Sequence, residues 1–290
     1  MRLHFVRMSY RSIVLLAVFA AAFAVPRNLA FAQDAPVDTA LIVSVDVSNS
    51  VDSDRYKLQM EGIAKALEDP GVIDAITGGP NGGILFAMVT WADRPTLALP
   101  WVRIANKQDA MALAQRVRKL PLQGGEFTCM TRMLRSANDK IVPQIPAKAL
   151  RVVIDVSGDG PDNCNPDEPI EKVRDELVAN GVTINGLPIL EGANAGGSGV
   201  APAGAAVAAP QGSAGLEDWY KAHVQGGTGS FVLPANGYGD FARAIRQKFV
   251  IEISGTPPPQ RVGATLVENR LVTVEGSVQP QHSVTAAKLD

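Results

Sequence analysis

Short runs of consecutive apolar residues alternate along this chain with segments in which apolar residues recur every three or four positions. The continuous runs are typical of strands that are buried on both faces, as in a parallel sheet. We predict such strands at residues 40–45, 83–90, 151–156 and 182–190, with a shorter edge strand at 96–104 and a further strand at 230–233. Amphipathic helices are predicted between them, at residues 56–67, 109–120, 131–141, 169–181, 216–224 and 241–249. This alternation predicts an α/β fold, a Rossmann-like, doubly wound and mostly parallel sheet flanked by helices on both faces.

Two segments do not fit the alternating pattern. Residues 192–214 are mainly Gly, Ala, Ser and Pro with almost no charge, which is typical of a flexible insertion. The polar tail, residues 254–290, opens with the run Thr256-Pro257-Pro258-Pro259. Its composition is compatible with a pair of short strands or with disorder. The core domain is therefore predicted to span residues 38–253.

The first 32 residues have the pattern of a secretory signal peptide. Arg2, Arg7 and Arg11 form a basic region, residues 13–25 are almost wholly apolar, and Ala30-Phe31-Ala32 supplies small residues before a cleavage site. The alternative is a membrane anchor, but a spanning helix needs about 20 apolar residues and this run is shorter. We expect cleavage after Ala32 and a periplasmic or secreted mature protein.

The charge of the chain excludes some classes of partner. The full sequence has a net charge of −2, and removal of the arginine-containing signal peptide makes the mature chain more acidic. A generic nucleic-acid binder would carry a positive surplus, so no nucleic-acid partner is expected. No other apolar run approaches spanning length, so we expect no membrane span in the mature chain.

Candidate chemistry begins directly after the first predicted strand, in the run Asp46-Val47-Ser48-Asn49-Ser50. One carboxylate and two hydroxyls at alternating positions are hard oxygen donors, which suit Mg²⁺, Mn²⁺ or Ca²⁺ better than zinc or copper. The competing interpretation is local, because Ser50 or Asp52 has the residue type that caps the following helix.

Two further loops are expected at the same edge, since ligands of such folds bind at the carboxyl ends of the strands. One contains Thr128 after Gly124 and Gly125, and the other contains Asp159 after the strand at 151–156. The order Asp-x-Ser-x-Ser, threonine and Asp-Gly resembles the von Willebrand factor type A (vWA) domain. The resemblance covers residues 38–253 and is strongest to uncharacterised exported bacterial proteins of that fold.

The resemblance implies a metal-ion-dependent adhesion site (MIDAS). Ser48 and Ser50 would ligate the ion directly, and Asp46 would act largely through water. Thr128 would reach the ion in the ligand-binding state, and Asp159 would complete the ring. The family's mechanism implies Mg²⁺, or Mn²⁺ or Ca²⁺, and a protein partner that presents an acidic side chain to the ion.

One departure from the family pattern leaves an alternative open. The family usually has Thr-Asp-Gly, whereas this chain has Ser157-Gly158-Asp159-Gly160. If the glycine is an insertion it would shift Asp159, and Asp155 would be the other candidate. Asp159 is favoured, because Asp155 lies within the apolar strand.

The two cysteines, Cys129 and Cys164, are close in sequence to Thr128 and Asp159. If both loops meet at the metal, the two sulfurs would come within range of a disulfide, which an oxidising compartment would allow. The alternative is two unpaired buried thiols.

Enzymatic interpretations find less support in the sequence. An EF-hand starting at Asp46 would have Val51 where glycine is needed. A serine hydrolase would need a histidine and a Gly-x-Ser-x-Gly elbow, but Ser48 lies in no such elbow and only His223 and His282 follow the signal peptide. We therefore expect a non-enzymatic binding module, with a purely structural metal as the main alternative and a hydrolase as a lesser one.

Overall fold

The structure is a computed structural model of the whole chain, and it describes residues 35–164, 168–191 and 213–255. The predicted signal peptide and almost all of the predicted tail lie outside the described residues. The same holds for most of the predicted insertion, although its last two positions already belong to helix α7 (Ser213–Trp219).

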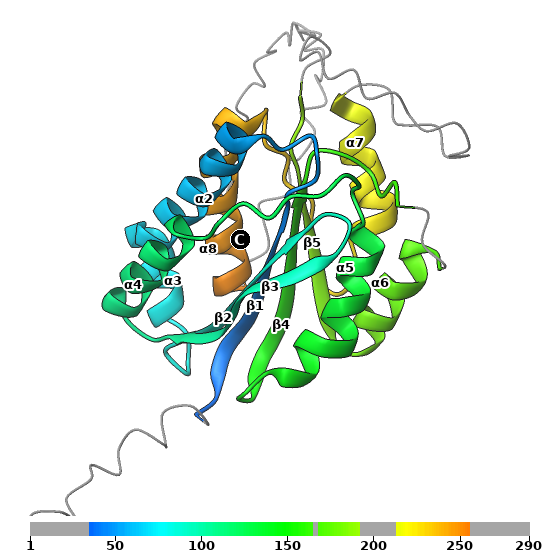
Figure 1. Cartoon of the computed structure of the whole chain (residues 1–290). Coiled ribbons are helices and arrows are strands. Elements are labelled where there is room, and N and C mark those ends of the chain that lie inside the picture. The colour runs from blue at the N-terminus through cyan, green and yellow to red at the C-terminus, as the bar shows by residue number, and fades with distance from the viewer. Residues whose placement is uncertain (1–34, 165–167, 192–212, 256–290) are drawn as a thin grey trace, which may run out of the picture. The chain divides into compact units, whose positions relative to one another are not determined.

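A single sheet of five strands forms the centre of the described part, in the order β3-β2-β1-β4-β5 (Figure 1). The parallel strands are β1 (Val37–Asp46), β2 (Ile84–Trp91), β4 (Ala149–Gly158) and β5 (Val182–Pro188). The edge strand β3 (Pro95–Ile104) is antiparallel to β2. After β3 the chain crosses to the other side of β1, so the topological switch point lies between the carboxyl ends of β1 and β4.

Helices cover both faces of this sheet, which confirms the predicted fold class (Figure 1). One face carries α2 (Ser53–Glu68), α3 (Pro70–Thr77), α4 (Lys107–Arg118) and α8 (Phe241–Ser254). The other carries α5 (Met130–Ser136), α6 (Ile170–Ala179) and α7, with π-helical turns η3 (Ala137–Ile141) and η5 (Tyr220–Val224) continuing α5 and α7. Short 3-10 turns occur at η4 (Val142–Gln144) and η6 (Tyr238–Asp240).

Local sequence explains where the helix nearest the candidate site begins. The N-cap of α2 is Asp52, whose carboxylate accepts hydrogen bonds from the backbone N–H groups of Asp54 and Arg55 at 2.9 and 2.8 Å. The predicted stripe of α2 is buried, including Tyr56, Met60 and Leu67. Asp52 therefore takes the capping role, and the side chain of Ser50 is left for other contacts.

Two elements differ from the sequence prediction. Helix α3 was not predicted, because it contains only two turns, opened by Asp69 as N-cap and Pro70 at the first position. The predicted strand at 230–233 was wrong, since the segment forms only isolated bridges, such as Val232 with Gly186. The Phe231 N–H bonds the side chain of Asn185 at 3.0 Å, while the Phe231 carbonyl and the Leu233 N–H bond only Gly186 in the backbone of β5, so the contact does not extend into a ladder. Pro234, which has no N–H, follows at once.

Candidate metal centre

Asp46 is the last residue of β1, and its side chain is fully buried. One carboxylate oxygen, Oδ1, accepts a hydrogen bond from the Ser48 N–H at 2.8 Å. The other, Oδ2, is buried and has no hydrogen-bond partner among the described residues. Such a carboxylate oxygen is costly to bury unless a ligand compensates it.

A chain of oxygen atoms lies beside this carboxylate and comes from three loops. The Thr128 hydroxyl donates to the Ser48 Oγ at 3.2 Å, and the Ser48 and Ser50 hydroxyls lie 3.2 Å apart. The Ser50 hydroxyl in turn donates to Asp159 Oδ1 at 2.7 Å. The structure therefore brings together the five residues that were predicted from the sequence as metal ligands, Asp46, Ser48, Ser50, Thr128 and Asp159.

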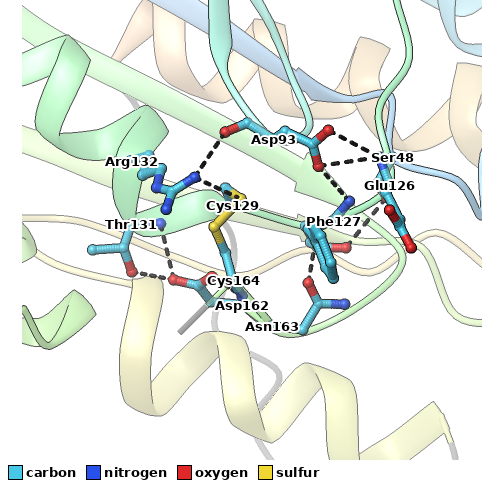
Figure 2. Close-up of a disulfide and its surroundings, with 11 residues drawn as sticks. Ser48, Asp93, Glu126, Phe127, Cys129, Thr131, Arg132, Asp162, Asn163 and Cys164 are labelled. Carbon is cyan, nitrogen blue, oxygen red and sulfur yellow. Dashed lines mark hydrogen bonds between the residues drawn. A yellow bond between two sulfur atoms is a disulfide. The ribbon is translucent and has the colours of Figure 1, made fainter. Parts of the chain in front are cut away.

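The loop that carries Thr128 is held from two sides (Figure 2). The Asp93 carboxylate accepts hydrogen bonds from the backbone N–H groups of Glu126 and Phe127, the latter at 2.7 Å. The Asn163 side chain accepts from the Thr128 N–H at 2.8 Å, and the Asn163 N–H donates to the Thr128 carbonyl at 3.1 Å. These bonds fix the backbone of Thr128 before any ligand is present.

The Cys129–Cys164 disulfide joins the segments that contain Thr128 and Asn163 (Figure 2). It closes a separation of 35 residues in sequence. Beside it, Asp162 accepts hydrogen bonds from both the backbone N–H and the hydroxyl of Thr131, so it serves as a cap for α5 from another loop. The loops that carry Thr128 and Asp159 are therefore covalently tied.

Asp159 follows β4 directly, and Gly158 belongs to the strand itself. Gly158 is the last residue of β4 and pairs with Pro188 of β5. A Cβ atom at this position would lie 2.9 Å from both Asp46 Oδ2 and the Tyr220 hydroxyl. A larger residue at this position would overlap two side chains that are already buried there.

Asp155, the alternative to Asp159, is not part of this site. Its fully buried side chain lies 3.4 Å from the Lys248 Nζ, which belongs to α8. On β4 it is three residues before Gly158, so it projects from the face opposite to that of Val156 and Gly158. The preference for Asp159 over Asp155 agrees with this geometry.

Three contributors to the rim of the site had no signal in the sequence. The Tyr238 hydroxyl donates to Asp159 Oδ2 at 3.0 Å, and the Arg55 guanidinium lies 5.2 Å from the centre of the Tyr238 ring. Arg55 also donates to the Ser50 carbonyl and pairs with Glu191 at 2.7 Å. Tyr238 opens the short 3-10 turn η6 and Glu191 follows β5, both far from the motif in sequence, so no spacing rule would have found them.

The electrostatics of the site favour a cation. Burial, and secondarily the charge of Asp159, raise the pKa of Asp46 to about 8. Burial also raises the pKa of Tyr220 and of Tyr238, with the nearby aspartates adding to the effect. A nearby positive ion would relieve the cost of the Asp46 charge.

The donor set decides which cations fit. It consists of three hydroxyls and two carboxylates, and within the described residues no group of three or more His, Cys, Asp or Glu side chains could hold a metal. Hydroxyl and carboxylate oxygens suit a hard divalent ion such as Mg²⁺, Mn²⁺ or Ca²⁺. With an unpartnered Asp46 oxygen beside them, these residues fit such an ion.

A protein family covers most of this chain. A family model described as "Protein of unknown function (DUF1194)" matches residues 36–257. A search of curated proteins gives no significant match. No helix in the described part of the chain combines the length and the apolar character needed to cross a membrane.

Solved structures of vWA type share the fold. Proximal thread matrix protein 1 (PTMP1) from the mussel byssus matches with a TM-score of 0.54 and 14% identity, over 76% of this chain and 49% of that one. The same protein "with zinc occupied MIDAS motif" matches at 0.52 with 18% identity, over 76% and 49% of the two chains. A von Willebrand factor type A protein from Catenulispora acidiphila matches at 0.50 with 18% identity, over 75% and 43%. The fold is therefore vWA-like, and the match spans about half of each of these longer chains.

Proposed function

Because this chain belongs to the DUF1194 family, whose function is unknown, we propose a function from its own site: an exported vWA-type module that binds a protein partner through a divalent cation. The residues that would hold the ion are Asp46, Ser48, Ser50, Thr128 and Asp159. The proposed ion is Mg²⁺, with Mn²⁺ and Ca²⁺ as alternatives of the same chemistry.

The continuous row of oxygens from Thr128 to Asp159, beside the unpartnered oxygen of Asp46, carries this proposal. Mg²⁺ prefers six oxygen ligands, and a site with this few side-chain donors leaves room for one from outside. When bound, the ion would supply an electrophilic coordination position suited to an acidic side chain of a partner. The MIDAS motif named for the mussel protein supports the same interpretation.

The surrounding residues support a binding role over a purely structural metal. The loops that carry Thr128 and Asp159 are already joined by a disulfide and by hydrogen bonds between Thr128 and Asn163. A metal is thus not required to hold these two loops together. Ser50, with an exposed side chain, leaves one side of the site open to a partner.

The same geometry favours binding over hydrolysis, and we propose a module that is not an enzyme. The Ser48 hydroxyl contacts the hydroxyls of Thr128 and Ser50. The one histidine within the described residues, His223, contacts Glu171 and stacks on Trp219 with ring centres 5.0 Å apart.

Export is the remaining part of the proposal. A disulfide persists in an oxidising compartment and is rare in the cytoplasm. Cleavage after Ala32 would leave the described core complete, since it starts at residue 35.

The test is capture of partners from the native cell envelope by the immobilised mature protein, in Mg²⁺ and in chelator. Asp159→Ala removes a proposed ligand, and Asp175→Ala, which removes an exposed carboxylate on α6, is the matched control. We expect partners that the wild type and Asp175→Ala retain in Mg²⁺ and release in chelator, and that Asp159→Ala does not retain. Identical partner sets under all these conditions, with all proteins folded by circular dichroism, would exclude the adhesion role.

A further inference from the structure

A groove of about 510 Å³ runs along α5 between the start of β3 and the start of α6. Within the described part of the chain, its charged lining consists of Arg94, Arg132, Arg135, Lys140, Asp139 and Glu168. Four positive side chains against two negative ones leave a surplus of two positive charges. The whole chain has a net charge of −2, so this basic groove is a local departure from the rest of the molecule.

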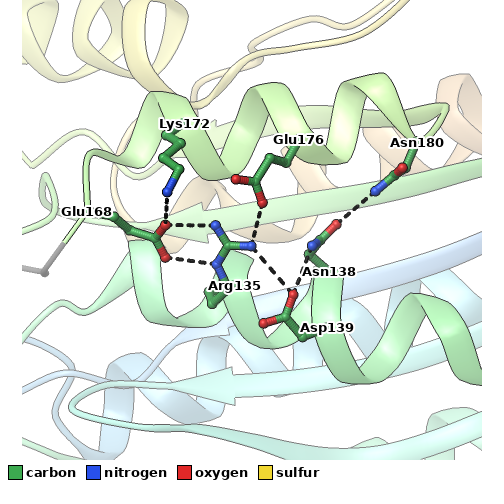
Figure 3. Close-up of polar contacts among 7 residues, drawn as sticks. All are labelled: Arg135, Asn138, Asp139, Glu168, Lys172, Glu176 and Asn180. Atoms are coloured by element: carbon green, nitrogen blue, oxygen red, sulfur yellow. Dashed lines mark hydrogen bonds and ion pairs between the residues drawn. The ribbon is translucent and has the colours of Figure 1, made fainter.

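The cations of the basic groove differ in how they are paired. Arg135 is saturated, since it makes a double hydrogen bond to Glu168 and a further one to Glu176 (Figure 3). Arg94 and Lys140 are exposed, and neither forms an ion pair with any carboxylate of the described residues. Arg132, also exposed, donates to the Asp93 carbonyl at 3.2 Å. Three positive charges of the groove therefore lack an acidic partner among the residues that the structure describes.

The basic groove begins beside the candidate metal centre. Thr131 and Arg132 line it and follow Thr128 by three and four residues. Arg132 also contacts the Cys129 sulfur at 3.9 Å, and its carbonyl partner Asp93 holds the Thr128 loop (Figure 2). A chain that reaches the metal centre from this side would lie over the basic groove.

We propose that the basic groove binds an acidic, extended segment of the protein partner, next to the acidic residue that occupies the metal centre. This inference rests on the proposed function. From Thr131 to Lys140, α5 and its π turn extend for roughly 13 Å at about 1.5 Å per residue. An extended peptide covers that distance with about four residues. The segment would therefore carry two or three Asp or Glu residues close to the metal-bound one.

The test compares two fluorescent peptides of about nine residues with a Gly/Ser background, one with a single central Asp and one with three additional Asp residues. Binding is measured by fluorescence anisotropy in Mg²⁺ and in chelator, at low and high NaCl. We expect the multi-Asp peptide to bind about tenfold more tightly at low salt, because each exposed ion pair changes a binding constant by up to about fivefold. High salt should remove this advantage.

The decisive variant is Arg94→Ala with Lys140→Ala, which removes two groove charges without breaking an ion pair of the described residues. Arg116→Ala with Lys119→Ala is the matched control, since it removes two exposed charges at the end of α4, on the other face of the sheet. The groove variant should lose the advantage of the multi-Asp peptide, and the control should keep it. If both variants weaken that peptide equally, or neither does, the groove proposal is wrong.

The two proposals fail in different ways. Binding of the single-Asp peptide that does not depend on Mg²⁺ would count against the metal-dependent function. The groove is assessed separately in chelator, from the salt-dependent difference between the two peptides and its loss in the groove variant. If binding does not depend on Mg²⁺ but the multi-Asp peptide keeps its salt-dependent advantage, only the metal centre is overturned. If binding depends on Mg²⁺ but that advantage is absent, only the groove is overturned.

Discussion

Gly158 shows how a single residue shapes the candidate site. Its absent side chain leaves the space in which Asp46 Oδ2 and the Tyr220 hydroxyl face each other, and both of these side chains are fully buried. The residue is therefore constrained by packing at the site rather than by its backbone conformation.

Gly158→Ala should lower the free energy of unfolding by roughly 1–3 kcal/mol, the usual cost of overpacking a tight core. Urea denaturation followed by circular dichroism measures this loss. Gly160→Ala is the matched control, because no atom lies within 4 Å of a Cβ at that position. Equal stability of the two variants would show that the contact around residue 158 relaxes without cost.

At the residue scale, the sequence predicts ligands better than their surroundings. Asp46, Ser48 and Ser50 alternate in a short motif that is visible without a fold. Tyr220, which lies beneath Asp46, was assigned only to a helix. Its role depends on the close packing of η5 against β4 and β5, and no local pattern encodes that contact.

At the scale of elements, α8 is attached to the sheet by a buried ionic cluster. The Lys248 Nζ lies 2.9 Å from Glu252 Oε1 and 3.4 Å from Asp155 Oδ1, and all three side chains are almost completely buried. Asn185 of β5 donates to Glu252 at 2.8 Å. Burial and the charge of Glu252 raise the pKa of Asp155, so its charged form is disfavoured relative to that of an exposed aspartate.

Lys248→Met should reduce the free energy of unfolding by about 3–5 kcal/mol, because it leaves buried carboxyl groups without their cation. Asp155→Asn should cost less, since burial and the charge of Glu252 already disfavour the charged form of Asp155. Urea denaturation of both variants near neutral pH tests the contrast. A larger loss for Asp155→Asn than for Lys248→Met would mean that Asp155 is the essential anion of the cluster.

The disulfide joins two loops, the one that follows β4 and the one that precedes α5. Replacing both Cys129 and Cys164 with Ala should lower the free energy of unfolding by roughly 3–4 kcal/mol, from the entropy of a closed loop of 35 residues. Chemical denaturation with and without reductant measures it. Reductant should bring the wild type close to the variant and leave the variant unchanged. A variant as stable as the oxidised wild type would contradict this role.

Elements with strong periodicity were predictable, and those fixed by tertiary contacts were not. The continuous apolar runs of β1, β2 and β4 and the stripe of α2 correctly predicted their type. The segment at 230–233 has strand-like residues, but Asn185 and Pro234 divert its backbone from a regular ladder. Asp155 looked like an anomaly in an apolar strand because its partner Lys248 lies almost a hundred residues later in the sequence.

At the scale of the whole molecule, the fold concentrates the candidate chemistry at one edge. The order of the strands reverses between β1 and β4, and at their carboxyl ends Asp159 lies close enough for its charge to raise the pKa of Asp46. This arrangement follows from the strand order. The alternation of strands and helices in the sequence predicts the class of fold to which such an order belongs. The exact side on which each helix packs is decided by tertiary contacts.

A metal that binds only the folded state should stabilise the entire domain. Mg²⁺ at about 100 times its dissociation constant would add about 2.7 kcal/mol to the free energy of unfolding. Differential scanning calorimetry of the mature protein should therefore show a melting temperature that rises with Mg²⁺ concentration. Thr128→Ala, which removes one proposed ligand, should weaken this response, whereas Thr183→Ala on the edge strand β5 should retain it. A melting temperature that is independent of Mg²⁺, Mn²⁺ and Ca²⁺ would exclude the metal centre.

Export and the disulfide are linked at the same scale, because the thiols need an oxidising compartment to pair. The precursor with residues 1–290, expressed in a bacterium with a periplasm, should yield a mature protein that begins at Gln33 and has no thiol reactive to alkylation. Residues 33–290 made in a reducing cytoplasm should instead carry two reactive thiols after denaturation and should unfold at lower urea concentration. Intact mass spectrometry after alkylation reads both the N-terminus and the thiol count. A precursor that keeps Met1 and both free thiols would contradict export, and oxidation of the cytoplasmic form would show that pairing requires no export.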